Sequence, residues 1–208
     1  MSARVQSEYS TKELSKRTWP DFEKLFMRQG VVGDGWWCWC THHHISSYSL
    51  PENQQPPSRA ERAVRNRQRK KGLVEQRCAH GILVYSGKKP IGWCQYGPRE
   101  ELPRVDNTRD YQRLDLENGG VRLWRITCFV VDKEYRGRGV AGAGLRAALE
   151  AIRKKGGGLV EAYPVSMTDQ GSNYIYCGTV SMFEKAGFTT MAPLATGRTA
   201  TVVMRKTI

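Results

Sequence analysis

The chain has 208 residues and a mass of 23.6 kDa, enough for one domain with a full hydrophobic core and too little for a multidomain assembly. Hydrophobic residues make up 39% of it, which excludes wholesale disorder. Its 33 Lys and Arg outnumber its 20 Asp and Glu, and the net charge of +13 indicates an anionic ligand or partner without saying which.

The sequence shows neither a secretory signal nor a membrane span. Residues 1–17 are polar, and nowhere do about 18 apolar residues run together. We therefore expect a cytoplasmic protein without a membrane partner. The six cysteines lack the regular spacing of secreted domains, so we expect free thiols.

The first expected elements are a short strand around 4–7 and an amphipathic helix. Thr18 can cap this helix, with Pro20 in its first turn and Gly30 at its end. Four apolar side chains then share one face that must pack on the rest of the protein: Trp19, Phe22, Leu25 and Phe26.

The segment 33–44 combines tryptophans, cysteines and histidines. Thiolate and imidazole are the ligands that zinc prefers, so Cys38, Cys40 and the histidines at 42–44 raise the question of a metal site. Against it, Cys-x-Cys is tighter than the usual Cys-x-x-Cys, and no second pair follows at zinc-finger spacing. We favour an aromatic wall beside a pocket, built from the tryptophans within 36–39, and expect no metal.

A basic segment follows at 58–77. Ser58 and Glu61 have the spacing of a capping box and predict a helix to about Gln76, with Gly72 as a kink or break. Eight Lys and Arg against two Glu give this segment +6 of the net charge. A solvated face, a clamp for an acidic acceptor and a nucleic-acid contact all fit, and the first is the usual outcome. Without a regular set of aromatic residues, nucleic acid is left open but not favoured.

The apolar pattern then changes to a period of two. Residues 82–85 and 90–96 predict a hairpin with Gly87 in its turn. The polar stretch 97–120 is expected to be an exposed, mobile loop. The strand after it, 121–131, is the most apolar in the chain.

This strand leads into a glycine-rich loop, Arg136-Gly137-Arg138-Gly139-Val140-Ala141, and a helix over 140–155. Glycines let successive backbone N–H groups converge at a helix N-terminus, which makes a nest for phosphate, and two arginines can neutralise a pyrophosphate. The loop matches neither the Walker motif nor the dinucleotide-binding glycine motif. A plain strand-to-helix connection is the alternative.

The order Arg-x-x-Gly-x-Ala after a core strand resembles the pyrophosphate loop of the GNAT superfamily of N-acetyltransferases. The similarity extends from about Trp19 to the end, with a second core strand at 159–163, a late helix and Gly-Phe turn at 179–188, and a final strand at 200–204. Cys-Trp-Cys at 38–40 and the Gly-Trp and Gly-Pro-Arg segments resemble a bacterial subgroup. This resemblance implies an α/β (α+β) fold, with a mixed, twisted central sheet flanked by helices, in a single domain spanning 1–208.

The resemblance also implies acetyl-CoA as co-substrate and direct attack of a neutral amine on its thioester. The strand ending at Val131 would splay from 159–163 with the pantetheine in the gap, and a backbone N–H near Val130 would stabilise the oxyanion. The residues expected to hold the coenzyme are Phe129, Val130, Val131, Arg136, Gly137, Arg138, Gly139, Val140 and Ala141.

The reaction requires a base for the ammonium proton, and an acid is sought for the coenzyme A thiolate. Glu161 is the first candidate for the base, because burying an idle carboxylate is costly, and an ion pair with a nearby arginine is the equal alternative. Many family members carry tyrosine where this chain has Phe183. We therefore expect Tyr176 to be the acid, ahead of Tyr163 and Cys177.

The expected acceptor is the primary amine of a small molecule, with 36–39 and Trp93 lining its side of the site. One alternative is an amine of a protein or an aminoacyl-RNA, for which the basic segment 58–77 would be the docking surface. Another is a CoA-binding protein without catalysis, which Phe183 allows. A homodimer is left open.

Overall fold

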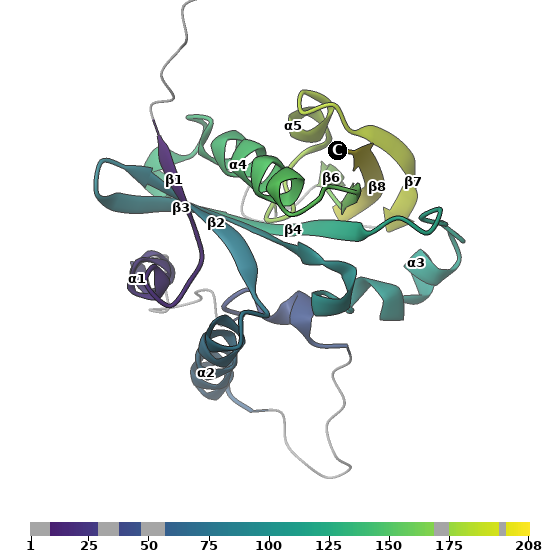
Figure 1. Ribbon diagram of the computed structural model, residues 1–208. Helices are drawn as coiled ribbons and strands as arrows, with labels where there is room; N and C mark the ends of the chain where they lie inside the picture. Colours follow the sequence, from purple (N-terminus) through teal and green to yellow (C-terminus); the bar gives the residue numbers. More distant parts are fainter. Residues whose placement is uncertain (1–8, 29–37, 47–56, 169–174, 196–198) are drawn as a thin grey trace, which may run out of the picture.

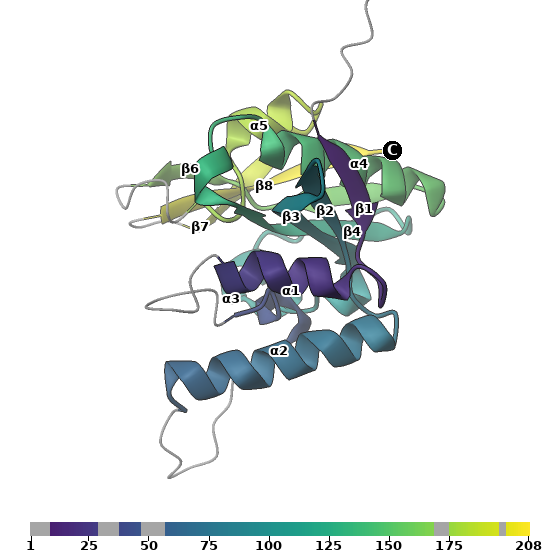
Figure 2. The same cartoon turned by 90° about the vertical axis from the view of Figure 1, so that its left-hand side faces the viewer.

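The computed structural model describes residues 9–28, 38–46, 57–168, 175–195 and 199–208. A twisted sheet forms the middle layer (Figure 1). Helices α4 (Val140–Lys154) and α5 (Val180–Glu184) cover one face, and α1 (Trp19–Arg28) and α2 (Arg59–Glu75) lie on the other, with α2 farther from the sheet than α1 (Figure 2). This mixed α/β architecture confirms the expected fold class.

In the part of the chain that the structure describes, eight strands make up the sheet. Their order is β1-β2-β3-β4-β5-β8-β6, with β7 also paired to β8. Among the described strand pairs, β4 and β5 are parallel and the others are antiparallel. The strands span Ser10–Glu13 (β1), His80–Ser86 (β2), Lys89–Pro98 (β3), Leu123–Val131 (β4), Leu159–Ala162 (β5), Val165–Thr168 (β6), Thr189–Ala195 (β7) and Thr199–Thr207 (β8).

Each face of the sheet has its own core. The alanine- and leucine-rich side of α4 packs on β2, β3 and β4. On the opposite face the cluster is aromatic: the ring centroids of Phe22 and Trp93 lie 4.8 Å apart, and those of Phe26 and Trp39 lie 5.6 Å apart. The predicted apolar face of α1 is confirmed, because Trp19, Phe22, Leu25 and Phe26 are all buried.

The predicted capping box is present at the start of α2. Ser58 accepts a hydrogen bond from the N–H of Glu61, whose side chain accepts one from the N–H of Ser58. The predicted break at Gly72 is wrong, since the helix continues to Glu75. The expected strand at 4–7, the helix end at Gly30 and two of the tryptophans, Trp36 and Trp37, lie outside the described residues.

The prediction of an exposed, mobile loop over 97–120 is wrong for much of that segment. It contains two 3-10 turns and the short helix α3 (Arg109–Gln112), and Leu102, Val105 and Tyr111 are buried. The physical reason is tertiary: Asp106 forms an ion pair with the fully buried Arg125 of β4, at 2.6 Å between carboxylate oxygen and Nη1. The polar sequence of 97–120 does not indicate that Arg125, in a later strand, is the ion-pair partner of Asp106.

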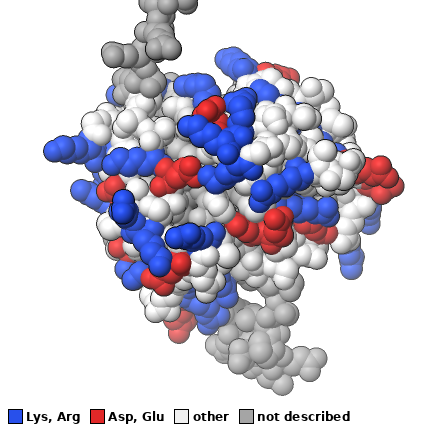
Figure 3. Space-filling view, viewed as in Figure 1, with Lys and Arg blue, Asp and Glu red and all other residues white. Residues whose placement is uncertain are grey.

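The six cysteines are free thiols, as expected. Within the described ranges, no helix has the length and apolar character needed to cross a membrane. On the face drawn in Figure 3, Lys and Arg side chains are spread widely, with Asp and Glu among them. The positive charge is therefore not concentrated on α2 alone.

Candidate active site

The site begins where β4 continues beyond the end of β5. Their parallel pairing ends at Ile126 and Ala162, whereas β3 follows β4 as far as Val131. The register between β3 and β4 shifts at this point and leaves Thr127 without an opposite residue. Such a bulge bends a strand and increases its twist. The last residues of β4 thus face a gap in the sheet.

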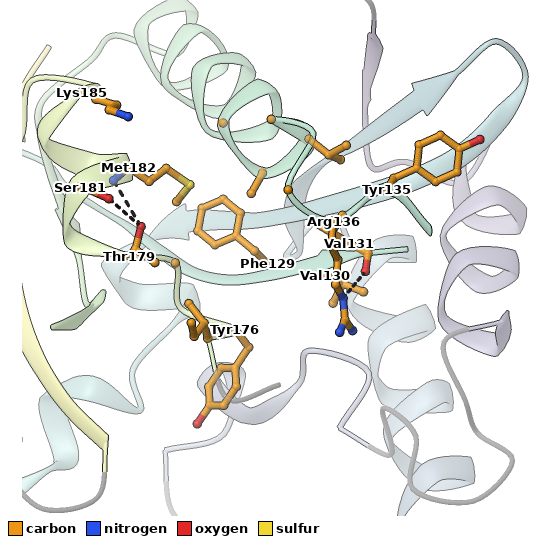
Figure 4. A pocket seen from close by; sticks show the side chains of 17 residues that line it. Phe129, Val130, Val131, Tyr135, Arg136, Tyr176, Thr179, Ser181, Met182 and Lys185 are labelled. Atoms are coloured by element: carbon orange, nitrogen blue, oxygen red, sulfur yellow. Dashed lines mark hydrogen bonds between the residues drawn. The ribbon is translucent and has the colours of Figure 1, made fainter. Parts of the chain in front are cut away.

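A cavity of about 450 Å³ opens at this gap, between the end of β4, the start of α4 and the segment before α5 (Figure 4). Eight of the nine residues expected to hold the coenzyme line it, and Tyr176 lines it as well. Arg138 and Glu161 do not. The lining residues are Phe129, Val130, Val131, Tyr135, Arg136, Gly137, Gly139, Val140, Ala141, Gly142, Ile175, Tyr176, Gly178, Thr179, Ser181, Met182 and Lys185.

The glycine-rich loop forms one end of the cavity. Gly137 and Gly139 have φ angles of +73° and +77°, a left-handed conformation that costs other residues about 1–2 kcal/mol. Gly139 is the N-cap of α4, so the N–H groups of Val140 and Ala141 belong to a first turn that has no intrahelical acceptor. Apart from the chain neighbours of each glycine, no heavy atom of the described residues lies within 4 Å of the position that a Cβ would take on Gly137 or Gly139. This arrangement fits a phosphate held by backbone N–H groups.

The two arginines of the loop differ from the expected arrangement. The guanidinium carbon of Arg138 lies 5.7 Å from the centroid of the Tyr135 ring, and its carbonyl accepts a hydrogen bond from Tyr9. Nε of Arg136 lies 3.5 Å from the carbonyl oxygen of Val131, on the side of β4 away from the loop (Figure 4). The Arg136 side chain is therefore not directed at the glycine nest in this structure (Figure 4).

A cation that the sequence analysis missed is Lys185, at the C-cap of α5. It lines the cavity together with Thr179 and Ser181, which lie at the start of the same helix. The Thr179 hydroxyl accepts a hydrogen bond from the N–H of Met182 and so caps α5. A threonine three residues before Met182 was a readable capping signal, but only the fold shows that α5 faces the glycine loop.

The backbone of Phe129 is less available to the coenzyme than expected. Its N–H donates to the carbonyl of Tyr176 at 2.6 Å. The coenzyme therefore cannot use that N–H without displacing Tyr176, although the Phe129 carbonyl points to the same side. Because N–H groups of alternate strand residues share a side, the next N–H directed at the gap is that of Val131.

Tyr176 is the one residue proposed for the chemistry that lines the cavity. Its side chain is 46% exposed and is directed away from the glycine loop (Figure 4). Partial burial, followed by the neighbouring Cys177, Cys128 and Cys38, raises the pKa of Tyr176 to about 12. The phenol therefore stays protonated at neutral pH. Phe183 is fully buried against Phe129 and Phe188 and offers no donor.

Glu161 is fully buried and has three hydrogen-bond donors. Nε of Arg205 donates to its Oε2 at 2.7 Å, and the hydroxyls of Tyr111 and Tyr163 donate to Oε1 at 2.8 and 2.5 Å. This is the ion pair that the sequence left open as the alternative to a base. The carboxylate does not reach the cavity directly, so any contact with substrate would pass through its tyrosine partners.

The cysteine and histidine segment raised the question of a metal site. In the part of the chain that the structure describes, no three His, Cys, Asp or Glu residues come together as metal ligands would. Trp39 and Trp93 are buried in the aromatic cluster, and neither lines the cavity, so their expected place beside the acceptor stays a prediction.

Comparison with known proteins agrees with this geometry. A model described as the Acetyltransferase (GNAT) family matches residues 38–188. No curated protein has a matching sequence. The N-acetyltransferase from Staphylococcus aureus Mu50 has a similar structure, with a TM-score of 0.54 at 11% identity over 96% of this chain and 98% of that one.

Two further solved structures cover 96% of this chain. The ribosomal-protein-S5-alanine acetyltransferase from Vibrio fischeri has a TM-score of 0.51 at 11% identity, with 93% of its own chain covered. A chain of the NatC complex bound to Gag peptide and CoA has a TM-score of 0.50 at 12% identity, with 98% covered. At these identities the likeness shows the fold alone.

Proposed function

Because the chain belongs to the GNAT family of acetyltransferases, we propose that it transfers an acetyl group from acetyl-CoA to a primary amine of a small molecule by direct attack. Family membership makes the protein an acyltransferase. The observation that carries the residue assignments is the gap beyond Ile126 and Ala162, where β4 leaves β5 beside the glycine loop and the cavity opens.

The coenzyme would lie with its pyrophosphate against the glycine loop. The N–H groups from Gly137 to Gly142 would hold the phosphate oxygens, because the glycines leave that space open and the first turn of α4 supplies donors. Arg136 and Lys185 line the same cavity and would add positive charge, Arg136 after a change of rotamer. Arg138 would contribute at most a long-range charge. When bound, the coenzyme supplies the acetyl thioester.

The exposed backbone of β4 would orient the thioester. The Val131 N–H is directed at the gap and is the donor that we assign to the developing oxyanion, while the Phe129 carbonyl would accept from a pantetheine amide. Val130 lines the cavity through its position in the strand. An amine would approach the gap from the side of the sheet on which α1 and α2 lie (Figure 2).

Tyr176 and Glu161 would have different roles in the reaction. Tyr176 would donate a proton to the departing thiolate, which its high pKa permits at neutral pH. Glu161 would act as a positioning residue that holds Tyr163 and Tyr111 on the acceptor side of the sheet. Its carboxylate does not touch the reacting atoms in this arrangement.

A thiol-release assay with acetyl-CoA and a library of amines tests this function. The proposal expects that coenzyme A thiol is released only when a small primary amine is present. If none of the amines in the library causes thiol release, the proposal is contradicted. Tyr176→Phe should lower kcat with little change in the KM for acetyl-CoA. Tyr135→Phe is the matched control, because its ring lies in the same cavity near the glycine loop.

A macromolecular acceptor is the second candidate, and one observation favours it. Helix α2 lies on the acceptor side of the sheet and exposes several basic side chains, among them Arg65, Arg69 and Lys71. Those side chains could dock a protein or an aminoacyl-RNA whose amine enters the gap. Assays with peptide and aminoacyl-RNA acceptors beside the amine library decide between the two.

A further inference from the structure

Helix α2 places a lysine inside the protein. Lys70 is fully buried, on the side of α2 that faces the sheet, and its Nζ lies 5.5 Å from the centroid of the Trp93 ring. A buried ammonium is costly unless hydrogen bonds and an opposite charge compensate it. Among the described residues, no Asp or Glu lies within ion-pair distance of Nζ, and its hydrogen bonds are made to His44 and to the carbonyl of Cys40.

His44 cannot supply the missing negative charge. Its Nδ1 lies 2.8 Å from the carbonyl oxygen of Glu101, which requires Nδ1 to carry the proton and donate. Nε2 is then the acceptor for Nζ of Lys70 at 3.0 Å. Burial, and then Lys70 itself, lowers the pKa of His44 well below its usual value, so the ring is neutral.

The charge of Lys70 acts on a neighbouring thiol, that of Cys40. Its Sγ lies 3.1 Å from Sγ of Cys128 on β4, and the two residues keep 3% and 8% of their surface exposed. Burial alone would raise the pKa of Cys40, but the contact with Cys128 and the charge of Lys70 outweigh burial, and the pKa is lowered. The contact with Cys40, followed by burial, raises the pKa of Cys128 well above its usual value.

The backbone at this point is strained. Trp39 and Cys40 both have a φ angle of +47°, a left-handed conformation that neither residue type prefers. Two consecutive residues of this kind persist only where the surroundings hold them, and such strain is typical of functional sites. Here the stacked aromatic rings hold Trp39, and this places Cys40 against Cys128.

We propose that Cys40 and Cys128 form an oxidisable dithiol, in which a peroxide converts Cys40 to a sulfenic acid and Cys128 resolves it to a disulfide. The proposal rests on the 3.1 Å contact between the two sulfur atoms and on the buried Lys70 beside them. It does not depend on the proposed function.

The chemistry balances with hydrogen peroxide as the oxidant. The Cys40 thiolate attacks one peroxide oxygen, the S–O bond forms as the O–O bond breaks, and the leaving hydroxide takes up a proton to become water. The Cys128 thiol then attacks Sγ of the sulfenic acid and loses its proton, and the hydroxyl group leaves as a second water. The two sulfur atoms together lose two electrons to the peroxide. A closure from 3.1 Å to about 2.05 Å completes the bond.

The location gives the bond a consequence. Cys128 directly precedes Phe129, which lines the cavity, and Cys40 lies in the described segment 38–46 on the acceptor side of the sheet. A disulfide would fasten that segment to β4 beside the gap. The side of the gap on which α1 and α2 lie would then be held in one conformation, while the glycine loop would be unaffected.

Mass spectrometry of the full chain tests the proposal. The reduced protein is treated with hydrogen peroxide, denatured and alkylated, and its tryptic peptides are analysed with and without dithiothreitol. We expect a reducible Cys40–Cys128 cross-linked peptide. A cross-link of either residue to another cysteine, or two alkylated thiols after peroxide treatment, would overturn the proposal.

Variants separate the roles of the three residues. Cys128→Ser should trap the sulfenic acid at Cys40, which dimedone labels, and Cys94→Ser is the control, because Cys94 is buried on the opposite face. Lys70→Met should slow cross-linking about tenfold by lowering the thiolate fraction. An unchanged rate of cross-linking in a Lys70→Met protein that circular dichroism shows to be folded would contradict the role of the lysine. The cross-link itself is tested on the wild-type protein, so that test does not depend on whether a variant folds.

Discussion

A Cβ atom on Gly92 would lie 2.4 Å from Cγ1 of Val140. Gly92 is in β3 and Val140 is the first residue of α4, so the absence of a side chain at position 92 lets the helix begin close against the sheet. The glycine loop, whose N–H groups we assign to the coenzyme phosphates, is held in place by this contact.

Gly92→Ala should therefore weaken coenzyme binding. Val140 is β-branched and stiff, so the helix start must move or the core must strain, at about 1–3 kcal/mol of unfolding free energy. We expect a higher KM for acetyl-CoA and a lower midpoint in urea. Gly72→Ala is the control: nothing lies within 4 Å of its Cβ position, and alanine within α2 should stabilise the protein by about 1 kcal/mol without changing the KM.

Substitutions in the loop itself test the phosphate nest. Gly139→Ala forces a side chain into a φ of +77° and should raise the Kd for acetyl-CoA at least tenfold in isothermal titration calorimetry. Gly87→Ala is the matched control and should leave the Kd for acetyl-CoA unchanged. Gly87 also has a positive φ, +56°, but it lies in the turn between β2 and β3, with nothing within 4 Å of its Cβ position. If both variants bind acetyl-CoA equally well, the loop is not the phosphate site.

The Glu161 network distinguishes a structural role from a base. Glu161→Gln leaves Arg205 as a buried charge without its partner and should cost about 3–5 kcal/mol of unfolding free energy in urea. Glu150→Gln on the exposed side of α4 should change it by less than about 0.5 kcal/mol. A Glu161→Gln protein of unchanged stability whose kcat falls a hundredfold would instead support the base.

Three consecutive histidines make stability depend on pH. Burial, followed by nearby positive charges, lowers the pKa of His43 from 6.5 to about 3, and burial lowers the pKa values of His42 and His44 as well. The folded state keeps these rings neutral while the unfolded chain takes up protons below about pH 6.5. The free energy of unfolding should thus fall as the pH drops from 6.5 towards 3.

The difference between wild type and His43→Gln isolates this contribution from the carboxylates that titrate in the same range. Urea unfolding at several pH values should show a shallower acid slope for the variant. Parallel slopes for the two proteins would mean that His43 is protonated in the folded state.

The elements with strong local signals were predictable from the sequence. The capping box at Ser58 and Glu61, the apolar face of α1, and the strand, glycine loop and helix at 121–155 all depend on residues near one another in the chain. Those signals located most of the cavity, because the glycine loop carries its own conformational requirement at Gly137 and Gly139.

What could not be predicted depends on contacts between distant segments. The stretch 97–120 looked mobile because its partner, Arg125, is buried in a later strand. Lys70 looked like one more surface charge in a basic helix, although the fold places it inside beside Cys40. Lys185 joins the cavity only because α5 returns to the edge of β4.

The most direct test of the central claim is a crystal structure of the protein with acetyl-CoA. Our account predicts the pyrophosphate within hydrogen-bond distance of the N–H groups between Gly137 and Gly142, and the thioester in the gap beside Val131. Density for the pyrophosphate away from this loop, or a thioester outside the gap between β4 and β5, would contradict it.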